Sequence, residues 1–470
     1  MAIQSIDPTT EEVLANFDEY TPRQVDQALA EAAAAFPAWR ERSFAERGDL
    51  MRRAASVLRE NKERYARLLT LEMGKPITQA EAEIEKCAWN CDFYAESAER
   101  FLTSEHIATN ARDSYVAFEP LGVILAVMPW NFPFWQVIRF AAPALMAGNT
   151  AVLKHASNVP QSALAIEELF RESGFPSGVF RTLLVSSGQV ESIIADDRVR
   201  AVTLTGSDAA GTKIAEAAGR HLKKTVLELG GSDPYIVLED ADLQAAADVG
   251  AMARCQNNGQ SCIAAKRFIV VDSVADEFEE QFAEAIARLK VGNPLERETQ
   301  VGPLARDDLR DALELQVRAS VDQGARVVMG GERLAGRGYF FAPTLLTNVS
   351  LSMPAWREET FGPAAALVRA GDADEAISLA NDSRYGLGAS LWTTDLKRGQ
   401  ALARRIESGA VFINGMVASD PRLPFGGVKR SGYGRELGEF GIREFVNVQT
   451  VWVGPAAVPA AAGAARASAE

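Results

Sequence analysis

Residues 121–136 read LGVILAVMPWNFPFWQ, an apolar run followed by a loop between two prolines. Similar runs, rich in β-branched residues, recur downstream and alternate with segments of helical periodicity. The runs lie at 121–128, 150–153, 179–185, 199–205 and 224–229, and the helical segments at 135–147, 161–173, 189–196 and 208–222. Strands that alternate with helices predict βαβ units, so we expect an α/β fold with a mainly parallel sheet and ligands beyond the carboxyl ends of its strands.

The flanking segments extend this prediction. Residues 24–102 carry apolar residues at helical spacing, as in 25–35, 44–73 and 77–101, with a break at Gly74-Lys75-Pro76. A second alternation from about 233 to 440 predicts another α/β lobe, with strands at 235–238, 266–271, 325–329 and 410–413 and a helix at 274–290. A cleft between two lobes is a common place for a binding site.

Composition narrows the class of protein. The chain has 470 residues, of which 47% are hydrophobic, enough for a large core and about three domains of ordinary size. Its net charge of -14 and the lack of a Lys/Arg run argue against a nucleic-acid partner. We see neither a signal-like N-terminus nor an apolar stretch of eighteen residues, so we expect a cytoplasmic protein without a membrane span.

Four cysteines in 470 residues do not form a disulfide framework. Cys87 and Cys91 lie four residues apart in a predicted helix, but no histidine or further cysteine lies nearby to complete a zinc site. We expect both to be small buried hydrophobic side chains. The three histidines are scattered, so no metal is expected.

Three residues in short patterns carry candidate chemistry. Cys262 follows Asn-Asn-Gly-Gln-Ser in a predicted loop and could act as a nucleophile, although a lone cysteine is more often structural. Glu228 ends an apolar strand before two glycines, where partial desolvation would suit a general base; a solvated strand-end carboxylate is the alternative. Asn131 lies between two prolines and could donate to an oxyanion or stabilise its own turn.

A fourth pattern, TGSDAAG at 205–211, follows a predicted strand and opens a helix. Small residues and free backbone N–H groups at a helix N-terminus suit the approach of a phosphate. The pattern is not G-x-G-x-x-G, so by itself it is a weak signal.

Taken together, seven blocks resemble the NAD(P)-dependent aldehyde dehydrogenase superfamily in order and spacing, over about residues 5–453. They are MPWNFPFWQ at 128–136, LKHAS at 153–157, TGSDAAG at 205–211, VLELGGSDP at 226–234, NNGQSC at 257–262, EETFGP at 358–363 and PFGGVKRSGYGRE at 424–436. The resemblance implies an α/β aldehyde dehydrogenase-like fold: a Rossmann-type dinucleotide-binding domain, an α/β catalytic domain and a small β oligomerisation element. The dinucleotide-binding domain is expected at 1–114 and 125–230, and the catalytic domain at 231–440. The oligomerisation element is expected at 115–124 and 441–455, followed by a flexible Ala-rich tail at 456–470.

The same resemblance assigns roles to residues. Cys262 would attack the aldehyde to form a thiohemiacetal, and Asn131 with the backbone N–H of Cys262 would hold the oxyanion. Hydride transfer would leave a thioester, which water activated by Glu228 would hydrolyse. The implied cofactor is NADP or NAD, and the implied assembly is a homodimer or homotetramer. Implied cofactor-binding residues are Trp130, Lys154, Ser157, Gly206, Ser207, Gly211, Leu229, Glu359 and Phe361.

Within the superfamily the chain is most similar to bacterial succinate-semialdehyde dehydrogenases, at LKHASN (153–158), ELGGSDP (228–234), INGMVASDPR (413–422) and FGIREFVNVQTVW (440–452). The similarity implies that Arg139 and Ser419 bind the substrate, with the arginine holding its carboxylate. Gln256 stands where some members have a second arginine, so other short acidic aldehydes, such as glutarate semialdehyde, stay open. Arg139 as a surface or interface residue is the alternative.

Two other classes of protein share the fold of this family and are alternatives to an aldehyde dehydrogenase that releases a free acid. A CoA-acylating relative typically lacks the glutamate base, so Glu228 argues against it. A non-catalytic structural relative would not need Cys262, Glu228 and Asn131 together.

Ser157 stands where the family often has a glutamate that repels a 2′-phosphate, so we expect NADP to be used at least as well as NAD. The alternative is that Ser157 only caps a turn and NAD is preferred.

Overall fold

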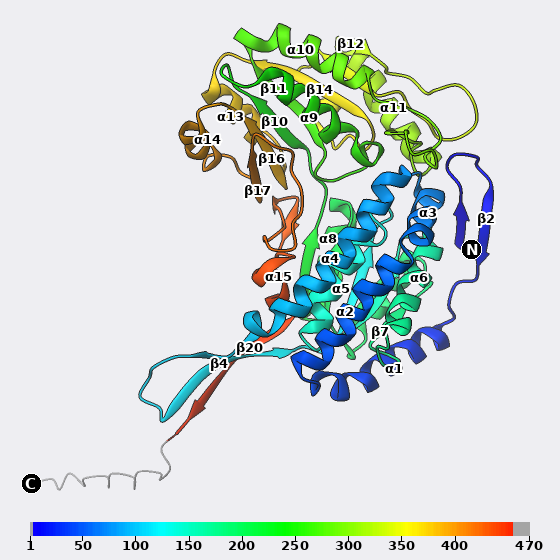
Figure 1. Cartoon of the computed structure of the whole chain (residues 1–470), viewed down its shortest axis with the longest axis vertical. Helices are drawn as coiled ribbons and strands as arrows, with labels where there is room; N and C mark the ends of the chain where they lie inside the picture. The colour runs from blue at the N-terminus through cyan, green and yellow to red at the C-terminus, as the bar shows by residue number, and fades with distance from the viewer. Residues whose placement is uncertain (1–2, 455–470) are drawn as a thin grey trace, which may run out of the picture.

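The computed structural model describes residues 3–454, which form two α/β lobes, each built around one sheet (Figure 1). The tail predicted at 456–470 lies outside the described residues. Within residues 3–454, none of the helices combines the length and apolar character needed to cross a membrane.

The first lobe contains a six-stranded sheet in the order β19-β9-β8-β5-β6-β7, parallel except for β19. Its strands are β5 (Val123–Met128), β6 (Thr150–His155), β7 (Phe180–Thr182), β8 (Val199–Thr205), β9 (Lys224–Glu228) and β19 (Gly432–Tyr433). The helices between them are α5 (Trp135–Met146), α6 (Pro160–Glu172), α7 (Val190–Ala195) and α8 (Asp208–Arg220). The predicted parallel α/β order is confirmed, although β7 is shorter than expected because it is an edge strand that pairs only with β6.

The N-terminal helices cover this sheet. They are α1 (Pro22–Arg40), α2 (Phe44–Glu60), α3 (Lys62–Met73) and α4 (Ile77–Leu102), preceded by the hairpin of β1 (Ile3–Ile6) and β2 (Val13–Phe17). The single helix expected over 44–73 is wrong: Asn61, at φ -103° and ψ 17°, leaves the helical conformation and separates α2 from α3. The break expected at Gly74 is present, since Gly74 takes a left-handed φ of 77°.

The second lobe contains a seven-stranded sheet in the order β12-β13-β14-β11-β10-β16-β17, parallel except for β12. Its strands are β10 (Asp233–Val237), β11 (Ala265–Val271), β12 (Arg326–Met329), β13 (Thr344–Thr347), β14 (Ala364–Ala370), β16 (Gly388–Trp392) and β17 (Ala410–Ile413). Its helices are α9 (Leu243–Cys255), α10 (Asp272–Ala287), α11 (Asp307–Asp322), α12 (Pro354–Arg357), α13 (Ala373–Asn381) and α14 (Leu396–Ala403). Strands β13, β14 and β16 were not expected; for β14 and β16 the reason is that Ala and Gly give their sequences a weak strand signal.

After the second lobe the chain returns to the first. Strand β19 pairs with β9, and α15 (Gly438–Arg443) packs on α4 and α5. Part of the range 231–440 expected for the catalytic domain thus packs on the first lobe, and the domain bounds stay a prediction. Strand β20 (Val446–Val453) then pairs with β4 (Asp113–Pro120), which also pairs with β3 (Glu105–His106), and these strands form an arm that projects from the body (Figure 1).

Candidate active site

The loop that carries Cys262 follows α9 and has an unusual backbone. Asn257, Asn258 and Gly259 have φ values of 55°, 60° and 72°, which asparagine and glycine adopt most readily. A Cβ atom added to Gly259 would lie 2.3 Å from the carbonyl carbon of Gly362. The close approach of these two backbone segments therefore holds the loop, and Cys262 with it, in one place.

Cys262 lies where two cavities meet. One cavity, of about 270 Å³, is lined by Cys262 together with Arg139 and Ser419. The other, of about 260 Å³, is lined by Cys262 together with Trp130 and Phe361. Cys262 therefore borders both cavities.

The electrostatics around Cys262 combine burial with positive charge. Burial raises the pKa of the thiol to about 12, while the charges of Lys266 and Arg139 act to lower it. The fully buried Lys266 Nζ donates to the carbonyl oxygens of Ser261 at 2.9 Å and of Cys262 at 2.8 Å. The ammonium thus fixes the loop and places a positive charge beside any anion that forms at the sulfur.

The amide of Asn131 is tied to the same loop. Its Nδ2 donates to the carbonyl oxygen of Gln260 at 3.0 Å, and its Oδ1 accepts from Gln136 Nε2 at 3.1 Å. An amide nitrogen carries two hydrogens, so one stays available for an oxyanion. Asn131 also lines the second cavity with Cys262, and its amide partners are Gln260 of the Cys262 loop and Gln136 in the first turn of α5.

Glu228 ends β9 and is only 2% exposed, so the alternative of a solvated carboxylate is wrong. Among the described residues, neither of its carboxyl oxygens has a hydrogen-bond partner. Burial raises its pKa well above the usual value, and the charge of Glu436 acts in the same direction while Arg139 opposes it. Glu228 lines neither of the two cavities, but its charge is close enough to raise the pKa of Cys262.

The second cavity lies at the carboxyl edge of the six-stranded sheet, where a dinucleotide is expected. The rings of Trp130 and Phe361 meet there at 84° with centroids 5.6 Å apart. Six of the predicted cofactor residues line it: Trp130, Gly206, Ser207, Leu229, Glu359 and Phe361. Gly211 lies behind the cavity wall, where a Cβ atom would lie 2.5 Å from Leu229 Cδ2, so its glycine lets α8 approach the sheet.

The remaining predicted cofactor residues follow the neighbouring strand β6. Lys154 is 9% exposed, and within residues 3–454 it has no ion-pair partner, while burial lowers its pKa. Ser157 is exposed two residues beyond the strand. An unpaired buried ammonium next to an uncharged hydroxyl fits the ribose and phosphate of a dinucleotide. The carboxylate of Glu359, which lines the second cavity, accepts a hydrogen bond from the Gly231 N–H at 3.0 Å. This bond fixes the carboxylate at that cavity.

Arg139 extends from α5 into the first cavity and is 3% exposed, so it is not a surface residue. It forms a buried ion pair with Glu436 and donates to Thr205 Oγ1 at 3.2 Å. Ser419 lines the same cavity and accepts a hydrogen bond from Lys86 Nζ at 2.8 Å. Sequence reasoning missed Lys86, which lines the cavity, and Glu436, which pairs with Arg139, because neither residue carries a local sign of these distant contacts.

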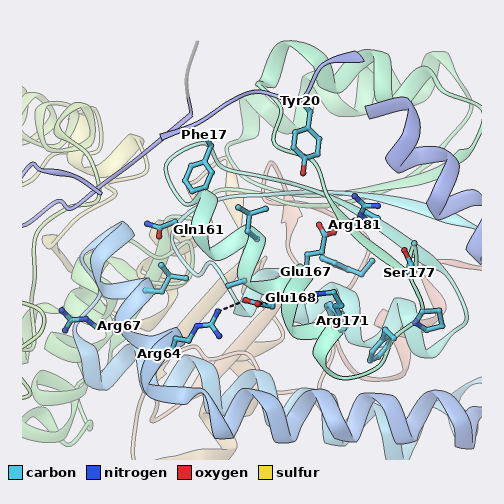
Figure 2. A pocket seen from close by; sticks show the side chains of 18 of the residues that line it. Phe17, Tyr20, Arg64, Arg67, Gln161, Glu167, Glu168, Arg171, Ser177 and Arg181 are labelled. Atoms are coloured by element: carbon cyan, nitrogen blue, oxygen red, sulfur yellow. Dashed lines mark hydrogen bonds and ion pairs between the residues drawn. The ribbon is translucent and has the colours of Figure 1, made fainter. Parts of the chain in front are cut away.

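A larger cavity, of about 740 Å³, lies elsewhere in the first lobe, between α3, α6 and β7 (Figure 2). None of the predicted site residues lines it. Arg64 there pairs with Glu168 at 2.7 Å, and Arg181 pairs with Glu167 at 2.9 Å. Two of its cations are therefore already neutralised, and none of the candidate chemistry faces it.

Known proteins resemble the chain along nearly all of its length. The model of the aldehyde dehydrogenase family matches residues 1–451. A probable succinate-semialdehyde dehydrogenase [NADP(+)] of Synechocystis sp. is 54% identical over 453 residues, which cover 96% of this chain and 100% of the relative. Succinate-semialdehyde dehydrogenase [NADP(+)] 1 of Mycobacterium tuberculosis is 50% identical, with 96% of this chain and 100% of the relative covered.

Among solved structures, succinic semialdehyde dehydrogenase from Streptococcus pyogenes in complex with NADP+ matches with a TM-score of 0.95 at 41% identity. The match covers 97% of this chain and 100% of that one. The resemblance seen in the sequence blocks is thereby confirmed for the fold and the family. Relatives that are about half identical over their whole length and 96% of this chain leave one conclusion: this chain belongs to the aldehyde dehydrogenase family.

Proposed function

We propose that the protein oxidises succinate semialdehyde to succinate with NADP+. The observation that carries this proposal is the position of Cys262 between a cavity lined by basic side chains and a cavity at the carboxyl edge of the dinucleotide-type sheet. An aldehyde with a carboxylate suits the first cavity, and a nicotinamide dinucleotide suits the second. The names of these two relatives support the same substrate and cofactor.

In the first half of the reaction, the thiol of Cys262 gives its proton to water and its sulfur attacks the aldehyde carbon. The negative charge that develops on the aldehyde oxygen is stabilised by the free N–H of Asn131 and by the nearby charge of Lys266. The nicotinamide of a bound NADP+ supplies the hydride acceptor. The acyl group is then a thioester on Cys262.

In the second half, Glu228 takes a proton from the water that attacks the thioester. Its raised pKa makes it a stronger base than an ordinary glutamate. Because Glu228 lines neither cavity in the conformation described, its side chain turns toward Cys262 for this step. Water then releases succinate and restores the thiol.

The preference for NADP+ follows from Lys154 and Ser157. Lys154 provides a positive charge without a carboxylate partner among the described residues, and Ser157 adds a neutral hydroxyl. Both suit a 2′-phosphate, because no acidic side chain at these two positions repels it.

We also propose that the protein is a homo-oligomer. The arm formed by β4 and β20 exposes Val448 (61%) and Trp452 (54%), and large apolar side chains on a projecting strand favour a protein partner. The choice between dimer and tetramer, and the cytoplasmic location, stay predictions from the sequence.

The test is a panel of aldehydes with NADP+ and with NAD+, followed by absorbance at 340 nm, with and without CoA. We expect kcat/KM to be highest for succinate semialdehyde with NADP+ and to be independent of CoA. Cys262→Ala is expected to form no reduced cofactor while still binding NADP+. A CoA-dependent reaction, equal use of butanal, or turnover by Cys262→Ala would contradict the proposal.

A further inference from the structure

Lys86 is a cation of the first cavity that the predicted substrate site does not include. It extends from α4, is half-buried, and lines the cavity together with Cys262 and Ser419. Its Nζ donates to Ser419 Oγ at 2.8 Å and lies 4.3 Å from the centroid of the Trp135 ring. The ammonium is thus held in one place at the wall of the cavity by a neutral hydroxyl and an aromatic face.

The other charged groups around this ammonium already have partners. Arg139, the other cation of the cavity, forms a buried ion pair with Glu436. Glu83 forms a buried ion pair with Lys75 and accepts from the backbone N–H groups of Phe134 and Trp135, at 3.0 and 2.9 Å.

Asp420, which follows Ser419, forms an ion pair with Arg422 at 2.6 Å. Within residues 3–454, Lys86 itself has no ion-pair partner. The cavity therefore carries one uncompensated positive charge, and that charge is on Lys86 rather than on Arg139.

We propose that Lys86 binds the carboxylate of the substrate and is a specificity-determining residue for acidic aldehydes. This inference rests on the proposed function and names the group that recognises the acid. The substrate carboxylate would take the place of a missing counter-ion, with Ser419 beside it as a second polar contact. Gln256, which lines the same cavity, is neutral and adds no charge. The aldehyde end of the same molecule would then face Cys262.

The test uses Lys86→Gln, because glutamine removes the charge and keeps an N–H donor, on a side chain one bond shorter. We expect the ratio of kcat/KM for succinate semialdehyde to kcat/KM for butanal to fall by about tenfold to a hundredfold, mainly through KM for the acid. Lys86→Arg should restore most of the ratio, because it restores the charge. Lys397→Gln, which removes an exposed lysine on α14, is the matched control and should leave the ratio unchanged.

A binding measurement supports the kinetics. Succinate and butyrate differ by one carboxylate, so Lys86→Gln should raise the inhibition constant of succinate and change that of butyrate much less. Equal losses for both aldehydes and both inhibitors, or an unchanged ratio, would overturn the role of Lys86. If the wild type itself showed no preference for succinate semialdehyde over butanal, the proposed function would fail, and this inference with it. If Lys86→Gln did not fold, Lys86→Met would replace it, and a ratio unchanged in that variant would also overturn the role.

Discussion

Asn131 Nδ2 lies 3.0 Å from the carbonyl oxygen of Gln260, so the proposed oxyanion donor is joined to the loop that carries Cys262. We expect Asn131→Ala to lower kcat by about a hundredfold to a thousandfold, because the donor acts on a charge that exists only after attack. Dissociation of NADP+, measured by fluorescence, should change little. A variant that lost cofactor affinity and activity in parallel would instead make Asn131 a structural residue.

Glu228→Gln should separate the two halves of the reaction. Thioester formation needs no base at this position, so a rapid burst of NADPH equal to the enzyme concentration should precede a slow steady rate. Quenched-flow or stopped-flow absorbance distinguishes the two phases. Slowing of the burst alone, with unchanged deacylation, would contradict the assignment of Glu228 as the base.

The pKa of Glu228 also predicts a pH dependence. Burial raises this pKa well above its usual value, so the carboxyl group of Glu228 becomes an active base only at a higher pH than an ordinary glutamate. Where deacylation limits turnover, kcat of the wild type should rise as the pH increases toward that pKa. The slow steady rate of Glu228→Gln should lack this rise. A wild-type kcat that fell over the same range would oppose the proposed role.

The buried pair of Arg139 and Glu436 predicts that Arg139 contributes to the stability of the fold. Arg139→Ala leaves Glu436 buried without a counter-ion, which costs about 3–5 kcal/mol in the free energy of unfolding. The double variant Arg139→Ala, Glu436→Gln should recover much of that loss in thermal unfolding. If Arg139 also contacts the substrate, KM for succinate semialdehyde should stay raised in the double variant while KM for butanal recovers. If the KM values for both aldehydes recovered in the double variant, the role of Arg139 would be structural only.

Lys86 should make the preference for acidic aldehydes depend on pH. Burial and the charge of Arg139 lower the pKa of Lys86 to about 8, against the opposing effects of Cys87, Glu83 and Asp420. The ammonium is charged below this pKa, so the kcat/KM ratio of succinate semialdehyde to butanal should fall as the pH rises from about 7 to 9. Ionisations of the enzyme that affect both aldehydes equally do not change this ratio. Lys86→Arg should keep the ratio flat, because a guanidinium stays charged.

Ser157→Glu should shift the choice of cofactor. A carboxylate at this exposed position would repel the 2′-phosphate of NADP+ and could accept from a ribose hydroxyl of NAD+. We expect kcat/KM with NADP+ to fall and the NAD+ preference to rise, as measured on both cofactors with one aldehyde. Ser157→Gln is the neutral control of equal length. If the wild type were selective for NAD+ and Ser157→Glu did not change the preference, Ser157 would not determine the choice of cofactor.

Local patterns in the sequence were sufficient to predict the parallel α/β core and to recognise the residues of the family blocks. Alternating apolar runs and helical periods specify strands and helices because each depends on neighbours in the chain, and the loop before Cys262 contains the Asn and Gly residues that its left-handed backbone requires. Weakly patterned strands, such as the Ala-rich β14, were not recognised, since their burial comes from distant segments.

Tertiary structure alone decided which charges are paired. Arg139 and Glu436 are 297 positions apart in chain numbering, and Lys86 and Ser419 are 333 apart, so no window of sequence relates them. The pKa of a buried group and the free charge of a cavity depend on what packs around it in space. For that reason the sequence could name Arg139 as the carboxylate ligand, whereas the packed structure shows that its charge is already balanced and that Lys86 holds the uncompensated one.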